Sequence, residues 1–272
     1  MSARRVSSLH AHTFYCDGTT GVDEMVEAAI DEGLAEIGFT SHAPLPFDIA
    51  WAMSLERLDA YMADVEAARE RYADRIRVRL GLEIDYVPDE RVLDFQRREL
   101  FPRGFEYFVA SVHFLGAGYP PTSYEGDPQR FRAILRDDYA GDIEAMVSDY
   151  YRRVRVSLTH PGVAIVGHID RIKRWNEGGV FFRDDASWYR DAVEETLRSV
   201  AGAGKIVELN TSGWRKGSSE PYPAPWILER CREHGIPILI TADAHAPDQI
   251  AWGFDRAEAC LGELGIEPVP AI

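Results

Sequence analysis

Short apolar segments alternate with amphipathic segments along most of this 272-residue chain, and this alternation restricts its fold more than any other feature. The longer segments repeat apolar residues at helical spacing, whereas the short ones are runs of four to seven residues. Repeated strand–helix units are typical of a parallel α/β fold. We expect strands at residues 6–10, 36–40, 76–82, 107–112, 164–167, 205–209 and 236–241. We expect helices at 22–32, 55–68, 89–100, 130–158 (in two pieces), 186–203, 225–234 and 255–264.

The length of the chain suits one α/β barrel. Apolar residues make up 46% of the sequence, which is enough for a full core. No linker or low-complexity segment divides the chain, so residues 1–272 are expected to form a single domain. The Gly-, Pro- and Tyr-rich stretch at 116–128 is long for a plain connection and is expected to be a functional lid.

Almost every predicted strand ends in a residue that can bind a metal ion. Side chains at the carboxyl ends of parallel strands meet at one end of an α/β barrel, where active sites form. Six of the eight histidines lie at such ends. The candidate ligands are His10, His12, Asp17, His42, Glu83, His113, His168, Asp243 and His245. The other two histidines, His160 and His234, lie at predicted helix ends and are expected to be structural.

His10 and His12 form a pair at the end of the first predicted strand. Residues i and i+2 of a strand point to the same face, so two imidazoles would lie side by side. Each candidate alone has an ordinary alternative, such as a loop histidine bonded to backbone or a solvated charge at a strand end. Nine at successive strand ends predict a metal site with mixed histidine and carboxylate ligands.

The overall charge excludes several kinds of partner. The formal net charge is −15, and a surface this acidic repels nucleic acid and anionic membranes. No apolar run approaches the ~20 residues of a transmembrane helix, and no signal peptide is evident. The cysteines Cys16, Cys231 and Cys260 suit free thiols in a reducing cytoplasm. We expect a cytoplasmic protein with a small-molecule substrate, drawn in by local positive charge; the oligomeric state stays open.

Seven short motifs surround the predicted ligands. They are His10-Ala11-His12 with Asp17-Gly18, Phe39-Thr40-Ser41-His42, Gly81-Leu82-Glu83-Ile84-Asp85, Ser111-Val112-His113, Gly167-His168-Ile169-Asp170, Glu208-Leu209-Asn210-Thr211-Ser212-Gly213 and Ala242-Asp243-Ala244-His245. Together they resemble the PHP-domain (polymerase and histidinol phosphatase) metallophosphoesterases, and the histidinol-phosphate phosphatases in particular. The resemblance covers nearly the whole chain. Ser41 and Cys16 depart from the acidic residue and the serine common in the family, but neither change removes a ligand.

The resemblance implies a distorted (β/α)7 barrel of the TIM-like PHP type with three divalent metal ions, which could be zinc, iron or manganese. By motif, the first ion is held by His10, His12, Glu83 and Asp243, the second by Glu83, His113 and His168, and the third by Asp17, His42 and His245. It also implies hydrolysis of L-histidinol phosphate to L-histidinol and phosphate, in histidine biosynthesis. We expect a hydroxide that bridges two ions to attack phosphorus, and Asp243 or His245 to pass a proton to the leaving oxygen.

Phosphate needs further hydrogen-bond donors, and basic residues follow two of the predicted strands. The expected substrate-binding residues are Arg215, Lys216, Ser212, Arg171 and Lys173. For the last two, a solvated basic surface is an equally good interpretation. Available walls for the histidinol part are Phe14, Phe47, Trp51, Asp85 and Tyr119. Arg152, Arg153 and Arg155 are expected to lie on the protein surface.

Three other functions remain open. A PHP phosphoesterase could act on another small phosphate, such as a nucleoside monophosphate or a sugar phosphate. An amidohydrolase also begins with His-x-His in a barrel but commonly uses a carboxylated lysine as the bridging ligand, and no lysine ends a predicted strand here. A non-catalytic PHP accessory module should lack ligands, whereas all nine are present.

Overall fold

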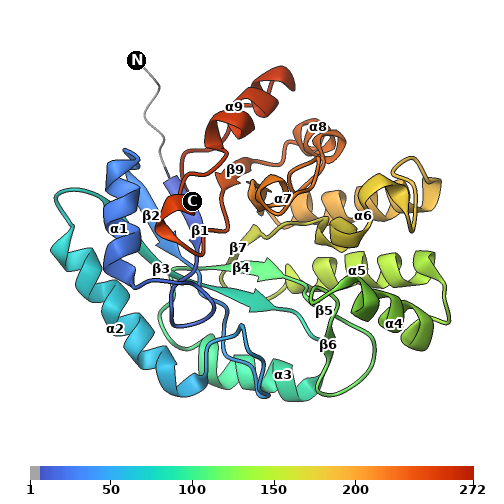
Figure 1. Cartoon of the computed structure of the whole chain (residues 1–272), viewed down its shortest axis with the longest axis horizontal. Coiled ribbons are helices and arrows are strands. Elements are labelled where there is room, and N and C mark those ends of the chain that lie inside the picture. Colours follow the sequence, from blue (N-terminus) through green and yellow to red (C-terminus); the bar gives the residue numbers. More distant parts are fainter. Residues whose placement is uncertain (1–6) are drawn as a thin grey trace.

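A computed structural model describes residues 7–272, and in it seven parallel strands form one curved sheet surrounded by helices (Figure 1). The order of the strands in the sheet is β1-β2-β3-β4-β7-β8-β9. Their bounds are β1 Ser7–Ala11, β2 Glu36–Phe39, β3 Arg77–Asp85, β4 Tyr107–Ser111, β7 Val163–Val166, β8 Ile206–Asn210 and β9 Ile238–Thr241. All seven predicted strands are therefore confirmed; position 6 of the first lies outside the described residues.

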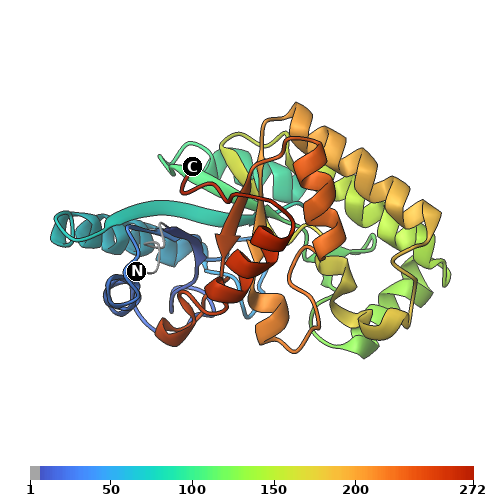
Figure 2. The same ribbon diagram turned by 90° about the horizontal axis from the view of Figure 1, so that it is seen from above.

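The helices follow the strands in sequence and cover the outer face of the sheet, as Figures 1 and 2 show. Their bounds are α1 Val22–Asp31, α2 Leu55–Arg71, α3 Glu90–Phe95, α4 Pro128–Asp138, α5 Ile143–Ser157, α6 Ser187–Gly202, α7 Ser212–Arg215, α8 Pro225–Glu233 and α9 Phe254–Glu263. A π-helical turn, Gln96–Leu100, extends α3, and short 3₁₀ segments lie at Arg171–Trp175 (η2), Glu177–Gly179 and Pro247–Gln249. No helix in the described part of the chain is long and apolar enough to span a membrane.

The sheet is closed into a barrel only at one end. Beyond the ends of β1 and β9, the N–H of His12 donates to the carbonyl of Ala244 (2.8 Å), and the N–H of Ala244 donates to the carbonyl of His10 (3.2 Å). These bonds lie at the carboxyl ends of the strands, where the predicted ligands are. The expected distorted seven-stranded barrel is therefore confirmed, and its closure holds the first and last ligand segments together.

Apolar side chains from opposite sides of the barrel fill its interior. Leu9 of β1, Tyr107 and Val109 of β4, Ile165 of β7 and Leu239 of β9 form one buried cluster. The Tyr107 hydroxyl crosses to donate to the carbonyl of Leu9 at 2.9 Å. The barrel is thus a packed core beneath the ligand end, and a substrate can enter only from that end.

The stretch at 116–128, predicted to be a functional lid, contains a short strand, and its role as a lid stays a prediction. Thr122–Ser123 (β6) pairs antiparallel with Phe114–Leu115 (β5). Arg153, expected on the surface, is buried and donates to the carbonyls of Phe114 and Gly116 at 3.0 Å each. The expectation for Arg153 was wrong because the unpaired carbonyls of this loop provide acceptors for its guanidinium group. The same expectation holds for Arg152, which is half exposed.

Candidate metal centre

All nine predicted ligand residues lie together at the carboxyl ends of the strands. Glu83 belongs to β3, and the histidines follow β1, β2, β4, β7 and β9 or end them. Seven of the nine side chains are largely buried, whereas Asp17 (33% exposed) and His245 (19%) face the opening of the barrel. The sequence prediction that these positions meet is therefore correct in space; their role as ligands stays a prediction.

Glu83 lies at the centre of the cluster, between two pairs of imidazoles. Its Oε2 is 3.4 Å from Nε2 of His10 and 3.6 Å from Nε2 of His12. Its Oε1 is 3.1 Å from Nε2 of His168 and 3.7 Å from Nε2 of His113. Each carboxylate oxygen therefore faces a different pair of Nε2 atoms, and Oε2 also lies 2.9 Å from Nδ1 of His42, so Glu83 is placed to bridge two ions.

A second group of donors lies nearer the opening. Oδ1 of Asp17 is 3.3 Å from Nε2 of His245, 3.9 Å from Nε2 of His42 and 3.9 Å from Nδ1 of His12. Asp243 joins the two groups, since its Oδ1 is 3.2 Å from Nε2 of His12 and 3.6 Å from Nδ1 of His245. The donor atoms thus form one continuous array rather than separate sites.

The spacing of these atoms fits divalent metal ions. Ligand bonds of about 2.0–2.2 Å in tetrahedral geometry place two donors about 3.4 Å apart, longer than a hydrogen bond. Among the described residues, the buried nitrogens His10 Nε2 and His12 Nε2 have no hydrogen-bond partner, which costs about 1–3 kcal/mol each. Metal coordination would satisfy them, and the mixed nitrogen and oxygen set suits zinc, iron or manganese.

Hydrogen bonds at the far side of three rings direct their Nε2 atoms toward the cluster. Nδ1 of His10 donates to Glu208 (2.8 Å), and Nδ1 of His245 donates to the carbonyl of Asp243 (2.9 Å). Nδ1 of His113 lies 3.0 Å from Oδ1 of Asp85. A proton held at Nδ1 leaves the Nε2 lone pair free for a metal. Asp85, expected as a wall of the substrate pocket, instead orients a ligand, because it is buried against His113.

Glu208 is the residue of this site that the sequence analysis missed. It is fully buried in β8, and its Oε2 accepts from Nδ1 of His10 (2.8 Å) and the hydroxyl of Thr241 (2.7 Å). Its Oε1 accepts from the N–H of His168 (2.7 Å) and the amide of Asn210 (2.8 Å). One carboxylate therefore positions ligands from two strands. A signal was present, since an acidic residue in the middle of an apolar strand needs buried partners.

The electrostatics prepare part of the cluster for metal binding. Burial lowers the pKa of His12 to about 3, helped by the neighbouring His245 and His42, so this ring is neutral. Burial alone would raise the pKa of Glu83, but the imidazoles of His42 and His10 outweigh it and hold the pKa well below the usual range. The carboxylate is thus ionised and the ring unprotonated, as ligands must be.

A cavity of about 480 Å³ opens above the cluster. Glu83, His113, His168, Asp243 and other members of the array form its floor. One wall carries the cationic side chains Arg130, Arg171, Arg174 and Lys216, and another carries Ile49, Ala50 and Trp51. The Trp51 ring lies against the imidazole of His42, with centroids 4.5 Å apart. The arrangement suits an anion held over the metal centre, with an apolar surface beside it.

The family model of the PHP domain matches residues 8–212 of this sequence. The chain belongs to the PHP domain family. A Deinococcus radiodurans protein named "Probable histidinol-phosphatase" is 33% identical over 259 residues, covering 94% of this chain and 92% of the relative. The resemblance inferred from the motifs is therefore confirmed.

Solved structures agree with the PHP fold. A Listeria monocytogenes protein with 24% identity superposes with a TM-score of 0.81 and covers 92% of this chain and 99% of its own. Histidinol phosphate phosphatase from Lactococcus lactis, solved with zinc, L-histidinol and phosphate, is 19% identical with a TM-score of 0.71, covering 98% and 95%. At these identities the two structures support the fold alone.

Glu83, not a lysine, lies between the imidazole pairs of the donor array, which argues against the amidohydrolase alternative. The chain has three lysines, and none lies between the imidazole pairs. Lys205 donates to the carbonyl of Val163, and Lys216 lies in the cavity wall.

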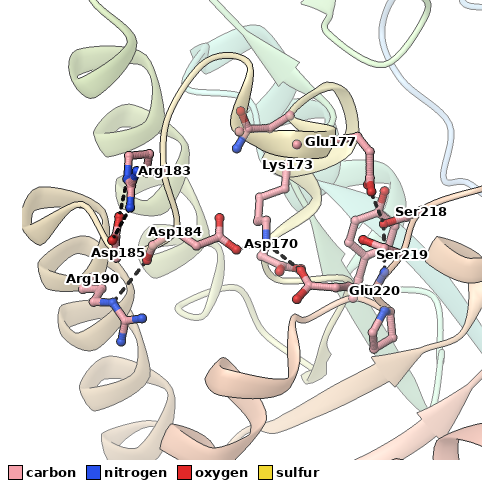
Figure 3. Close-up of a pocket in the computed structure, with 15 residues that line it drawn as sticks. Asp170, Lys173, Glu177, Arg183, Asp184, Asp185, Arg190, Ser218, Ser219 and Glu220 are labelled. Atoms are coloured by element: carbon pink, nitrogen blue, oxygen red, sulfur yellow. Dashed lines mark hydrogen bonds and ion pairs between the residues drawn. The ribbon is translucent and has the colours of Figure 1, made fainter.

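Lys173 lies away from the cavity above the donor array, in contrast to its predicted role in binding the substrate phosphate. Its ammonium points into a different pocket, where it contacts Asp184 (2.6 Å) and Glu220 (2.9 Å), with Asp170 beside it (Figure 3). Arg171 and Lys173 are two residues apart in the short 3₁₀ segment η2, and their side chains point in different directions. Arg171 faces the metal centre, whereas Lys173 does not. The spacing of Arg171 and Lys173 along the sequence does not predict that their side chains enter different pockets.

Arg215 and Ser212 support Asp243 rather than face the cavity. The Arg215 guanidinium donates to the carbonyls of Ala242 (2.6 Å) and Asp243 (2.7 Å). The Ser212 hydroxyl donates to Oδ2 of Asp243 at 3.1 Å. Asp243 has a φ of +50°, a strained value for a residue with a side chain, and these bonds hold it there. Both residues were predicted to bind phosphate. In the structure their hydrogen-bond donors bind Ala242 and Asp243 instead, so they support Asp243.

Removing metal ions from the purified protein is expected to destabilise it, because the buried donors then lose their partners. At free metal about 1,000 times the dissociation constant, binding contributes about 4 kcal/mol, so the melting temperature should fall by about 10 °C. Circular dichroism melts with and without EDTA, and after zinc is added back, measure this. An unchanged melting temperature in a sample shown to be stripped of metal would contradict the assignment.

Proposed function

We propose that this protein is a metal-dependent phosphomonoesterase that hydrolyses L-histidinol phosphate to L-histidinol and phosphate. The observation that carries the proposal is the continuous array of nitrogen and oxygen donors beneath a cavity with a cationic wall. The substrate rests on the relatives, which are named histidinol-phosphatases and match along nearly the whole chain.

The array would hold three divalent ions. The proposed ligands are His10, His12, Glu83 and Asp243 for the first, Glu83, His113 and His168 for the second, and Asp17, His42 and His245 for the third. When bound, such ions supply Lewis acidity and make a water acidic enough to react near neutral pH. The two oxygens of Glu83, each facing its own pair of imidazoles, support the division between the first two sites.

Arg171 and Lys216 would bind the non-bridging oxygens of the phosphate. Both line the cavity, and Nζ of Lys216 lies 3.6 Å from Oδ2 of Asp243, at the edge of the metal centre. Their charges would balance the negative charge on the phosphoryl group, which is the main requirement of phosphoryl transfer. Of the other predicted phosphate-binding residues, Ser212 and Arg215 would act only through Asp243.

In the reaction, a water oxygen bonds to phosphorus and the bond from phosphorus to the histidinol oxygen breaks. The leaving oxygen takes up a proton, which Asp243 or His245, both in the lining of the cavity, would deliver. The imidazole of histidinol would lie against Trp51. Of the other expected walls, Phe47 and Tyr119 pack in the same apolar cluster as Trp51 but do not line the cavity, and Phe14 is 43% exposed.

The test is phosphate release from histidinol phosphate, compared with a panel of nucleoside monophosphates and sugar phosphates, with metal content measured on the same sample. We expect a strong preference for histidinol phosphate and about three metals per chain. If the protein binds metal but prefers another ester, the proposed substrate would be wrong and the proposed metal centre would stand. No hydrolysis after zinc or manganese is added would overturn the proposal in favour of an accessory module.

A further inference from the structure

The cationic wall of the cavity carries more positive charge than its own carboxylate can balance. Arg171 and Arg174 of η2 and Arg130 of α4 lie around Glu125, which belongs to the loop before α4. Arg171 donates hydrogen bonds from Nε and Nη2 to the two carboxylate oxygens of Glu125. Nη1 of Arg174 is 3.8 Å from Oε2 of Glu125, beyond a hydrogen bond, and the Arg130 guanidinium forms no ion pair with any residue of 7–272.

Two buried donors in this wall lack acceptors. Within the described part of the chain, Nη1 of Arg171 and Nε of Arg174 are buried without a hydrogen-bond partner, and only 3% of the Arg171 side chain is exposed. A buried guanidinium N–H without an acceptor is costly, so a ligand oxygen that reaches it gains a charge-assisted bond. Both observations point to an anionic ligand at this wall.

The arginines extend outward from the metal centre. Arg171 is buried, Arg174 is 24% exposed, and Arg130 lies at the surface. The phosphate that reacts must lie on the donor array, where Lys216 and Arg171 already face it. A single phosphate therefore leaves Arg130 without a counter-charge, and leaves Arg174 with only the carboxylate of Glu125, which it shares with Arg171.

We propose that Arg130 and Arg174 form a second anion subsite, which binds a carboxylate or phosphate group on the leaving part of the substrate. The enzyme would then hydrolyse phosphomonoesters that carry a second anionic group, in addition to the cationic histidinol ester. This inference rests on the proposed phosphomonoesterase activity, because it places the second group relative to the reacting phosphate. The charge of Glu125 is engaged with Arg171, so it does not cancel the subsite.

Two esters that differ by one carboxylate group test the subsite. We would measure kcat/KM of the metal-loaded enzyme for 4-carboxyphenyl phosphate and phenyl phosphate, in the wild type and in the variants R130A, R174A and R130A/R174A. The ratio of the two values should fall about 10-fold or more in the double variant, since a hydrogen bond to a charged group is lost. Replacing Arg174 by lysine keeps the positive charge, so Arg174→Lys should retain part of the ratio that R174A loses. The control is Arg98→Ala, which removes the same charge from an exposed residue that contacts Asp94.

Histidinol phosphate adds a further test. Its leaving part is cationic, so removing Arg130 and Arg174 should lower its kcat/KM much less than that of 4-carboxyphenyl phosphate. An equal fall for all three esters would overturn the proposal, since the arginines would then serve only the reacting phosphate. An unchanged ratio in the double variant would overturn it as well.

Binding of non-hydrolysable analogues separates this inference from the proposed activity. Calorimetry with 4-carboxyphenyl phosphonate and phenyl phosphonate needs no turnover. Tighter binding of the carboxylated analogue, lost in R130A/R174A, would support the subsite even if no ester were hydrolysed. Equal binding of both analogues by the wild type would refute the subsite while leaving phosphatase activity untouched.

Discussion

Replacing Glu83 by glutamine should reduce the hydrolysis of histidinol phosphate by about 10³-fold or more. The carboxylate is the one group whose two oxygens face both imidazole pairs, His10 with His12 and His113 with His168. An amide has the same shape but no negative charge, and its NH₂ end cannot bind a metal. The measurement is the rate of phosphate release, with metal content of the variant determined by mass spectrometry.

The matched control for this variant is Glu99→Gln, which removes one charge from an exposed residue of the π-helical turn, 3.8 Å from Arg103. We expect it to keep wild-type activity and metal content. If Glu83→Gln kept three metals and near-normal turnover, the bridging role of Glu83 would be wrong.

Replacing Glu208 by glutamine should weaken metal binding by about 10–100-fold, as is usual when the partner of a metal-bound histidine is removed. Glu208 accepts four hydrogen bonds, and the loss of its charge makes His10 a weaker ligand. The amide NH₂ would also face a donor, at a cost of about 1–3 kcal/mol in folding free energy. Activity measured against free metal concentration should shift to higher metal and recover largely at saturation.

Thr241→Val separates the charge of Glu208 from its hydrogen bonds. It removes only the hydroxyl that donates to Oε2 of Glu208, at almost constant volume. We expect a small loss of stability and little change in the metal dependence of activity. A loss in Glu208→Gln that excess metal does not reverse would indicate that Glu208 maintains the fold rather than the metal ligands.

The positions of the ligand residues were predictable because they depend on backbone topology. In a parallel α/β barrel every strand ends on the same side, so His42 after β2 and His168 after β7 must approach each other once the strands are placed. The periodicity placed those strands to within about two residues at most ends. The motifs then identified the family, and with it the seven-stranded barrel.

The contacts of individual side chains were not predictable from that periodicity. Arg153 was expected on the surface, but it is buried because the carbonyls of Phe114 and Gly116 accept its bonds. Arg171 and Lys173 are two residues apart and enter different pockets, since η2 is a short 3₁₀ turn rather than a strand. Such directions depend on contacts between segments far apart in the sequence.

The sequence by itself determined the class of fold, the family and the set of residues that meet at the metal centre, because all three follow from the order of strands and the residue types at their ends. The tertiary structure decided how that centre is supported. Glu208 joins ligands from β1 and β7 through hydrogen bonds that span 198 and 40 residues of sequence. No local pattern contains this information, since it arises only when β7 pairs with β8 and the closed barrel brings β1 next to β9, within reach of Glu208.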